Sequence, residues 1–369
     1  MIDVPFHKRI VIGIEIEAYS INVADHSIGR RLSRPKPGTS EDGERFTRDA
    51  SIGSEYNSRP FQTVRESLFL LKAGLRKYMR NLYRSRDEEL DYRIPLLVGG
   101  WTNRFAGTHL HISLHQKALT QSAASSLARH IHDQIPFFIA LGANSPIWNR
   151  RMTGRASNRV LRGSNIHFVP GKKGQLTSIN NQELVYSPGR KTKPATLELR
   201  VLDSNVPEYI VAALCCLKAV CLRWLRGLRV ANSLTHPEYL QARMDTATKG
   251  LCCHIPWRGD WLPLSDYLDR FLWEHREEFE LMDIPDEIFE VLRLLKCGYN
   301  GSRLLHDAVL IAQHEHPQTW QRRFAKRYQT GLTHLLSGNT LHDFAQELRV
   351  PLPNTQRVWL GRERGSIDE

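Results

Sequence analysis

The sequence lacks any apolar run near the ~20 residues that a transmembrane helix needs. Its first residues, Met-Ile-Asp-Val-Pro-Phe, also lack the basic-then-apolar order of a signal peptide. We therefore expect a cytoplasmic protein with no membrane partner. With 369 residues, of which 41% are hydrophobic and 24% charged, the chain has enough apolar material for a sizeable core.

Cysteine is scarce and irregularly spaced. The six cysteines form neither the paired CxxC spacing of a zinc knuckle nor the framework of a small disulfide-rich secreted protein, and they are Cys215, Cys216, Cys221, Cys252, Cys253 and Cys297. We expect them to be buried free thiols.

Acidic residues are fewer than basic ones, and the formal net charge is +12. Residues 149–195 hold ten Lys or Arg residues against one acid, Glu183. This segment is rich in Gly, Ser and Asn and has little periodicity, which is typical of long loops at a binding site. The excess charge suits a triphosphate or a nucleic acid, but the sequence shows no RNP, zinc-finger or helix-turn-helix motif.

The stretch Ile10-Val-Ile-Gly-Ile-Glu-Ile-Glu17 alternates with the period of a β-strand. Its even-numbered isoleucines point to one face, while Gly13, Glu15 and Glu17 point to the other. Gly13 leaves room for a ligand to approach the backbone. Two neighbouring carboxylates repel each other unless a cation lies between them, although an ordinary solvated edge strand has the same pattern.

Two later stretches repeat this pattern. In residues 108–114, His109 and His111 oppose three apolar side chains, and in residues 196–203, Glu198 and Arg200 do the same. An antiparallel sheet with helices on its apolar face would gather these ionisable groups on its open face. Carboxylates with an imidazole suit Mg²⁺ or Mn²⁺ better than a thiolate-rich zinc site does.

The rest of the chain predicts an α+β fold. Helices are expected over 63–84, 122–141 and 207–228, the last capped by Ser204 or Asn205, and a polar loop over 22–48. Asp49 and Glu55 follow that loop and would suit further metal ions. From about residue 231 the pattern is helical, near 264–278, 284–296, 302–313, 317–336 and 340–348. We therefore divide the chain into a catalytic core, 1–230, and a helical region packed on it, 231–369.

Five motifs carry a family resemblance: Gly13-Ile-Glu-Ile-Glu17, Gly107-Thr-His-Leu-His111, Asn144-Ser-Pro146, Gly154-Arg-Ala-Ser157 and Leu197-Glu-Leu-Arg-Val-Leu-Asp203. In this order they resemble the bacterial carboxylate–amine ligases of the glutamate–cysteine ligase type, within the glutamine synthetase-like superfamily. The resemblance covers roughly residues 8–225. It implies an antiparallel sheet that forms an open funnel holding ATP and two or three Mg²⁺ or Mn²⁺ ions. True glutamine synthetases carry an additional N-terminal domain, so we expect the compact ligase type.

The resemblance also implies residue roles. Glu15, Glu17, Glu55, His109 and Glu198 would hold the metal ions, with His111 behind His109 and with Asp49 as a base or a further ligand. Arg200 would stabilise charge on the transferred phosphoryl group. Arg155 and Arg159 are candidates for binding phosphate or a substrate carboxylate, because guanidinium pairs bidentately with either.

The expected reaction joins a carboxylate to an amine through an acyl phosphate made from ATP. Glutamate and cysteine are the default substrates of the family, and a larger acidic acceptor suits the basic loops equally well. A nucleic-acid-binding protein and a catalytically inactive regulator on the same fold are the alternatives. The sequence leaves open whether the protein forms a homo-oligomer.

Overall fold

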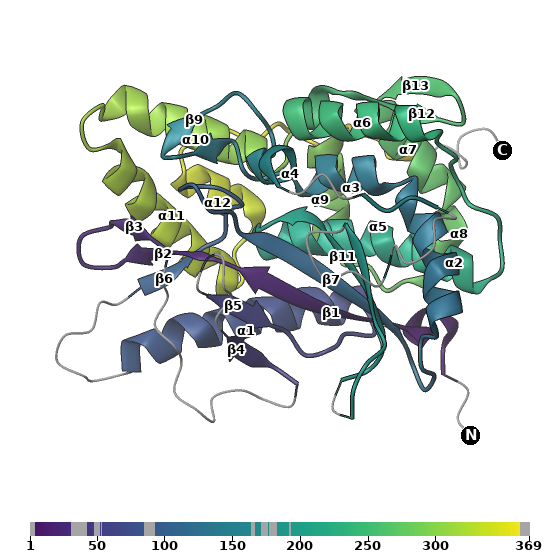
Figure 1. Ribbon diagram of the computed structural model, residues 1–369. Coiled ribbons are helices and arrows are strands. Elements are labelled where there is room, and N and C mark those ends of the chain that lie inside the picture. The colour runs from purple at the N-terminus through teal and green to yellow at the C-terminus, as the bar shows by residue number, and fades with distance from the viewer. Residues whose placement is uncertain are drawn as a thin grey trace.

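Six antiparallel strands form the main sheet of the computed structural model, in the order β10-β11-β7-β1-β5-β4 (Figure 1). The structure describes residues 4–30, 43–47, 52, 54–84, 93–163, 167–170, 176, 183–191 and 193–361. The three predicted strands are confirmed, and they lie next to one another at the centre of the sheet. The strands of this sheet are β1 (Ile10–Glu17), β4 (Arg45–Thr47), β5 (Glu55–Asn57), β7 (Gly107–Leu114), β10 (Leu184–Ser187) and β11 (Thr196–Asp203).

The two faces of the main sheet differ as the alternation predicts. Ile10, Ile12, Ile14 and Ile16 are at most 1% exposed, whereas Gly13 and Glu15 on the opposite face are only partly buried. Helices α5 (Pro207–Leu225) and α3 (Ile135–Gly142) pack on β1 and β11 from the apolar side. Burial of this face against helices leaves the ionisable face available for ligands.

The helix predicted over 122–141 is wrong in one respect, because the structure has two helices there. Helix α2 (Gln121–His132) ends before Asp133, and α3 begins at Ile135. Pro136 has no backbone N–H to donate to the preceding turn, and its ring clashes with a continuous helix. The predicted cap of the third helix is also wrong: α5 follows Val206 without a side-chain cap. Helix α1 (Val64–Arg84) agrees with its prediction.

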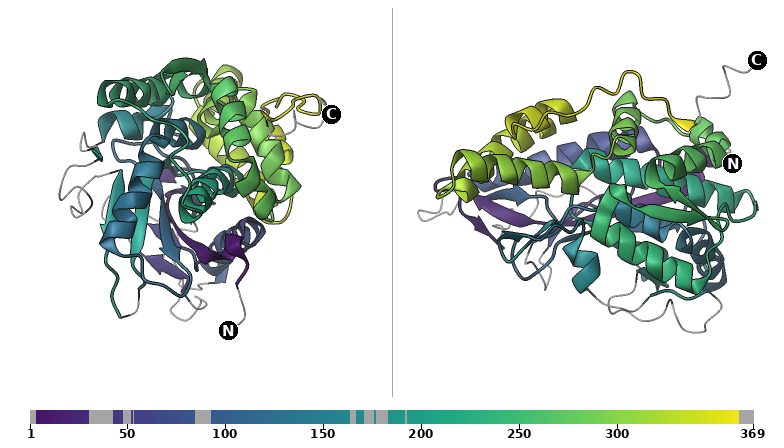
Figure 2. Two further views of the ribbon diagram at one scale, coloured as in Figure 1. Left: turned by 90° about the vertical axis from the view of Figure 1, so that its right-hand side faces the viewer. Right: turned by 90° about the horizontal axis from the view of Figure 1, so that it is seen from above.

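The C-terminal region is helical, as predicted, and its green and yellow helices gather on one side of the strands (Figures 1 and 2). Two elements were not expected there: helix α6 (His236–Lys249) and the hairpin of β12 (His254–Trp257) and β13 (Asp260–Pro263). The division at residue 230 stays a prediction. The other helices of this region are α7 (Leu264–Glu274), α8 (Arg276–Leu281), α9 (Asp286–Lys296), α10 (Gly301–Glu315), α11 (Trp320–Leu336) and α12 (Leu341–Glu347).

Short elements complete the fold. Strands β2 (Tyr19–Asn22), β3 (Ile28–Gly29) and β6 (Arg93–Leu96) form a small sheet, and β8 (Ile147–Trp148) pairs with β9 (Arg151–Met152) before the short helix α4 (Asn158–Arg162). Within the described ranges, no helix is both long and apolar enough to cross a membrane. The six cysteines are free, as predicted, but Cys252 is exposed and Cys297 is only partly buried.

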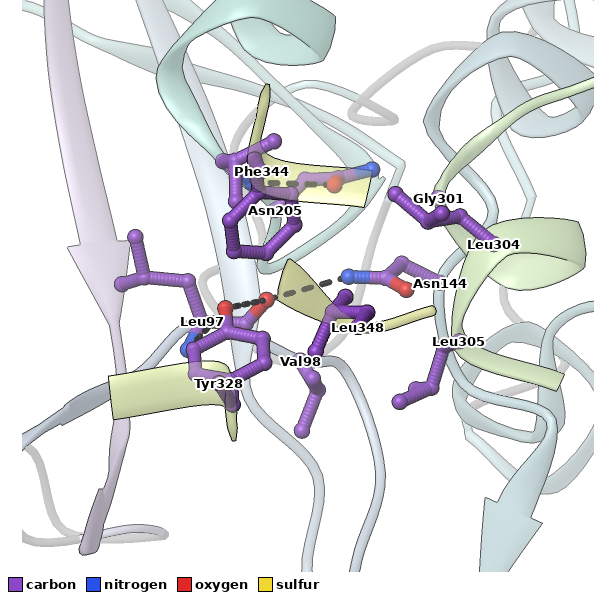
Figure 3. Close-up of a pocket in the computed structure, with 11 residues that line it drawn as sticks. Leu97, Val98, Asn144, Asn205, Gly301, Leu304, Leu305, Tyr328, Phe344 and Leu348 are labelled. Atoms are coloured by element: carbon purple, nitrogen blue, oxygen red, sulfur yellow. Dashed lines mark hydrogen bonds between the residues drawn. The ribbon is translucent and has the colours of Figure 1, made fainter. Parts of the chain in front are cut away.

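A small cavity lies where the C-terminal helices meet the loops behind the sheet (Figure 3). The Tyr328 hydroxyl of α11 accepts a hydrogen bond from Leu97 N at 3.1 Å, and Asn144 Nδ2 donates to Leu97 O at 3.0 Å. The volume is only about 10 Å³ and the lining is mostly apolar. This cavity is a packing gap of about one water molecule and is too small for a substrate.

The central strand predicts a stability test. Leu110 is 0% exposed and lies opposite Ile14 and Leu199 in the two neighbouring strands. Leu110→Ala should lower the free energy of unfolding by about 2–5 kcal/mol because it leaves a cavity in the core. Leu310→Ala, on a side chain that is 44% exposed, should cost about 0.5 kcal/mol. Urea denaturation measures both, and equal losses would show that Leu110 does not lie in the core.

Candidate active site

The pairing register of β1, β7 and β11 brings the predicted ionisable groups together. Glu15 lies opposite His109, and His111 lies between Gly13 on one side and Glu198 on the other. Because side chains alternate along each strand, all of these groups project from the same face of the sheet. Three segments that are distant in the sequence thus form one polar cluster.

Two imidazoles separate the two carboxylates of this cluster. His109 Nδ1 lies 3.6 Å from Glu15 Oε2 and 3.2 Å from Glu198 Oε1. His111 Nε2 lies 3.2 Å from Glu15 Oε1 and 4.0 Å from Glu198 Oε1. His109 is 5% exposed, so it forms the floor of the cluster, while the other side chains are partly buried.

The charges of the cluster are strongly coupled. Burial alone would raise the pKa of Glu15, but the contacts with His109 and His111 outweigh it and hold that pKa well below its usual value. Burial opposes ionisation of Glu198 too, and its contact with His109 lowers the pKa. Burial disfavours the His109 cation, yet Glu15 and Glu198 raise the pKa of His109 to about 9. A second positive charge would therefore compete with the imidazolium proton for the same carboxylates.

The cluster fits a small divalent ion. Glu15, His111 and Glu198 each offer one ligand atom, and these atoms all lie within 4.8 Å of one another. Ligand atoms around Mg²⁺, at about 2.1 Å from the ion, stand about 3–4.2 Å apart, so only a small contraction is needed. His111 Nε2 is buried, and its 3.2 Å contact with Glu15 Oε1 is not aligned as a hydrogen bond, so a neutral ring could offer its lone pair to an ion in place of that contact.

This set differs from the predicted one in its histidine. We predicted His109 as the ligand with His111 behind it, and this assignment stays a prediction. The three-ligand cluster contains His111, whereas His109 contacts both carboxylates from below through Nδ1. The i, i+2 spacing correctly placed both histidines on the ionisable face of the sheet. It does not show which histidine faces an ion and which one contacts the carboxylates from below.

Two arginines border the cluster. Arg200 Nε lies 3.2 Å from Glu198 Oε1. Arg159, on α4, donates from Nη2 to Arg200 O at 2.9 Å and lies 3.4 Å from His109 Nε2. A Cβ atom at Gly107 would stand 2.3 Å from this guanidinium, so a larger residue there would require Arg159 to move from its present position. Arg155 is exposed, on the loop before α4.

The remaining predicted ligands lie towards the edge of the sheet. Glu17 is 7% exposed, accepts a hydrogen bond from Gly107 N at 2.5 Å, and is paired in register with Glu55. Glu55 accepts hydrogen bonds from Thr47 Oγ1 at 2.8 Å and Asn57 Nδ2 at 2.6 Å. Asp49 lies outside the described residues.

A Cβ atom at Gly13 would meet His111 Cβ at 3.8 Å, an ordinary contact, so the geometry does not demand glycine there.

Asp203 connects the motifs around this site, and sequence reasoning gave it no role. Its Oδ2 accepts hydrogen bonds from Asn144 N and Ser145 Oγ, both at 2.7 Å, and its Oδ1 accepts from Ser157 Oγ at 3.1 Å. Burial raises the pKa of Asp203 despite these donors. The Asn-Ser-Pro stretch, the loop before α4 and the end of β11 are therefore fixed to one another. In the sequence, the one indication of this role is that Asp203 ends the strand motif of residues 197–203.

Comparison with known proteins gives a local sequence match. The model of glutamate-cysteine ligase family 2 (GCS2) matches residues 78–164, which include β7 and Arg159. A curated protein of Rubrobacter xylanophilus, provisionally named glutamate–cysteine ligase 2-3, is 40% identical over 81 residues. The match covers 21% of this chain and spans only 19% of that relative.

Solved structures match over nearly the whole chain at low identity. The complex of the ligase PafA with the prokaryotic ubiquitin-like protein Pup has a TM-score of 0.58 at 11% identity and covers 93% of this chain and 79% of that one. A bifunctional glutathione synthetase of Pasteurella multocida has a TM-score of 0.56 at 13% identity, with 90% and 53% covered. Glutamate–cysteine ligase of Francisella tularensis, in complex with AMP, has a TM-score of 0.52 at 11% identity, with 92% of each chain covered.

These structures and this chain share a mixed fold of helices and antiparallel sheet. The predicted resemblance to the glutamate–cysteine ligase type is confirmed by the family model and the curated relative together. Likeness at these identities shows the fold, whereas the chemistry depends on the residues of the site.

The coupled charges predict a pH dependence for the metal-free protein. The His109 pKa of about 9 lies above the value of about 6.5 expected in the unfolded chain. Its contribution to the free energy of unfolding is therefore complete below about pH 6.5 and is lost as the pH rises through about 9. NMR of histidine-labelled protein should show His109 titrating near this value, and Glu15→Gln should lower it. A titration near 6.5 in both proteins would contradict the coupling.

Proposed function

We propose that this protein is an ATP-dependent carboxylate–amine ligase. The observation that carries the proposal is the Glu15–His111–Glu198 cluster on the open face of a fold shared with such ligases. Two of the structural neighbours were solved with adenine nucleotides, the Francisella tularensis ligase with AMP and PafA with ADP. The sheet would form the predicted open funnel, built by the 1–230 core with the 231–369 region packed on it.

The proposed reaction has two steps. A carboxylate oxygen of the first substrate attacks the γ-phosphorus of ATP, the bond to the β-phosphate oxygen breaks, and ADP leaves. The amine of the second substrate then attacks the acyl carbon, inorganic phosphate departs, and the amine loses a proton to a base. Phosphoryl transfer needs positioning and neutralisation of charge more than it needs a covalent catalyst.

The cluster residues would neutralise the triphosphate through Mg²⁺ or Mn²⁺. Glu15 and Glu198 would hold an ion between them, with His109 or His111 as the nitrogen ligand, and Glu17 with Glu55 would supply the outer part of the site. Such an ion would withdraw negative charge from the transferred phosphoryl group. Asp49 is the proposed base or an additional ligand.

The arginines would act on the transferred group directly. Arg200 is proposed to stabilise charge on the phosphoryl group, and Arg159 to bind a phosphate or a substrate carboxylate close to His109. Arg155 has the same proposed role from the loop, and Gly13 leaves space along β1 for the nucleotide. The substrates are proposed to be small molecules, with glutamate and cysteine as the family's default pair.

Metal-dependent nucleotide binding is the first test of this function. Wild-type protein should bind Mn²⁺ and ATP together, as seen by electron paramagnetic resonance and calorimetry. Glu15→Gln should weaken Mn²⁺ binding about tenfold or more, because it removes a charged ligand atom. Glu280→Gln, on the exposed surface of α8, is the matched control and should have no effect. Absence of metal-dependent ATP binding in the wild type would contradict the proposal and favour nucleic acid as the partner of the basic segment.

The role of Arg200 can be separated from metal binding. Phosphate release, screened first over pools of carboxylates and amines, should fall about 100-fold in Arg200→Gln, since a donor to the developing charge is lost. The Mn²⁺ affinity should change by no more than about threefold, because Arg200 offers no ligand atom to a cation. Unchanged turnover would contradict the role, and an equal loss of metal binding would instead assign Arg200 to holding Glu198.

A further inference from the structure

A second, much larger cavity lies beyond the Glu17 end of the sheet, between the β2–β3 hairpin and the β8–β9 turn. Its volume is about 420 Å³, enough for several substrate groups, and it is open to solvent. Figure 1 shows β3 and β9 on the same side of the molecule. The residues that line it are Ile28, Gly29, Arg30, Thr102, Asn103, Asn149 and Arg150.

The lining is cationic and polar. Arg30 and Arg150 are exposed, and neither forms an ion pair with a carboxylate in the part of the chain that the structure describes. Thr102, Asn103 and Asn149 add hydroxyl and amide groups. No acidic residue stands among the described lining residues, so these residues offer no carboxylate to hold a metal ion. An anion bound there would contact the guanidinium groups directly.

The turn between β8 and β9, which carries Arg150 on one side of the cavity, has a strained backbone conformation. Asn149 and Arg150 have φ angles of 49° and 60°, and a positive φ is costly for an arginine. The turn is fixed by Arg150 N, which donates to Trp101 O at 2.7 Å, and by Asn149 N, which donates to Thr102 O at 3.1 Å. Trp101 is also held in place, because its backbone N–H donates to the Tyr19 hydroxyl at 3.1 Å. These hydrogen bonds fix the turn that carries Arg150 against residues 101 and 102.

The same loop connects the cavity to the candidate active site. Thr102 lines the cavity, and Gly107, five residues later, donates its N–H to Glu17. Five residues span at most about 18 Å, so the cavity is within reach of an elongated substrate whose other end lies at the carboxylates.

We infer that this cavity binds a non-reacting carboxylate of an elongated acidic substrate, such as a short peptide with acidic side chains. The inference rests on the proposed ligase function, for which it names the substrate class. The triphosphate of ATP belongs at the metal-binding cluster, whereas this cavity offers only direct guanidinium and amide contacts. It selects the substrate by charge at a distance from the reacting atoms.

The test uses two peptides and the full-length protein. Calorimetry should show that tri-glutamate binds about tenfold or more tightly than tri-glutamine. Arg150→Asn removes the guanidinium while asparagine tolerates the positive φ, and this variant should lose about fivefold or more of the tri-glutamate affinity. Arg30→Gln should do the same. Lys117→Gln, which removes an exposed charge from the turn after β7 at the opposite end of the sheet, should change the affinity by less than about twofold.

The outcomes separate this inference from the proposed function. Equal binding of the two peptides to the wild type, or unchanged tri-glutamate affinity in both arginine variants, would overturn the cavity assignment even if Mn²⁺ and ATP bind normally. A parallel loss of ATP affinity in Arg150→Asn would also overturn it, by assigning the cavity to the nucleotide. If the protein binds tri-glutamate more tightly than tri-glutamine but shows no metal-dependent ATP binding, the result would support an acidic ligand for the cavity and contradict the proposed ligase function.

Discussion

The antiparallel register of β1 with β7 and β11 is the constraint on which the site depends. Glu15 is placed opposite His109 and Glu198 opposite His111, and these pairings put two carboxylates within reach of both imidazoles. A shift of one residue would turn every side chain of a strand to the opposite face, burying charge and exposing isoleucine. The apolar core below the sheet therefore fixes the geometry of the polar cluster above it. Stability and ligand placement are set by the same hydrogen-bond ladder.

The cluster supplies its own counter-charge, because its imidazoles lie against its carboxylates. Burial disfavours both carboxylates, and the two imidazoles offset this cost by contacting them directly. The proton on His109 then occupies the electrostatic position that a divalent cation would take. Binding of the proposed divalent ion would be coupled to loss of this proton, so the carboxylates would keep a positively charged partner in either state.

Alternation alone predicted the three central strands, their apolar and ionisable faces and most of the cluster, because a period of two is a strong signal when one face is buried. The break between α2 and α3 was missed because helical spacing of apolar residues runs across it, although Pro136 marks it. Which of His109 and His111 faces an ion depends on side-chain rotation that spacing does not encode. The anchoring by Asp203 depends on contacts between residues about 60 positions apart, such as Asn144 and Asp203. Such contacts exist only after folding.

The proposed metal ligands are held by a different part of the fold from Arg150 and Arg159, and this has a functional consequence. Glu15, His111 and Glu198 stand on paired strands at the centre of the sheet, where the backbone is fixed from both sides. Arg150 stands on a turn and Arg159 on a short helix between loops, where the sequence can change without breaking the ladder. Chemistry common to many substrates is best placed on rigid strands, and selection among substrates on the connections. Substitutions on the strands should therefore remove activity towards every substrate, whereas substitutions on the connections should change which substrate is used.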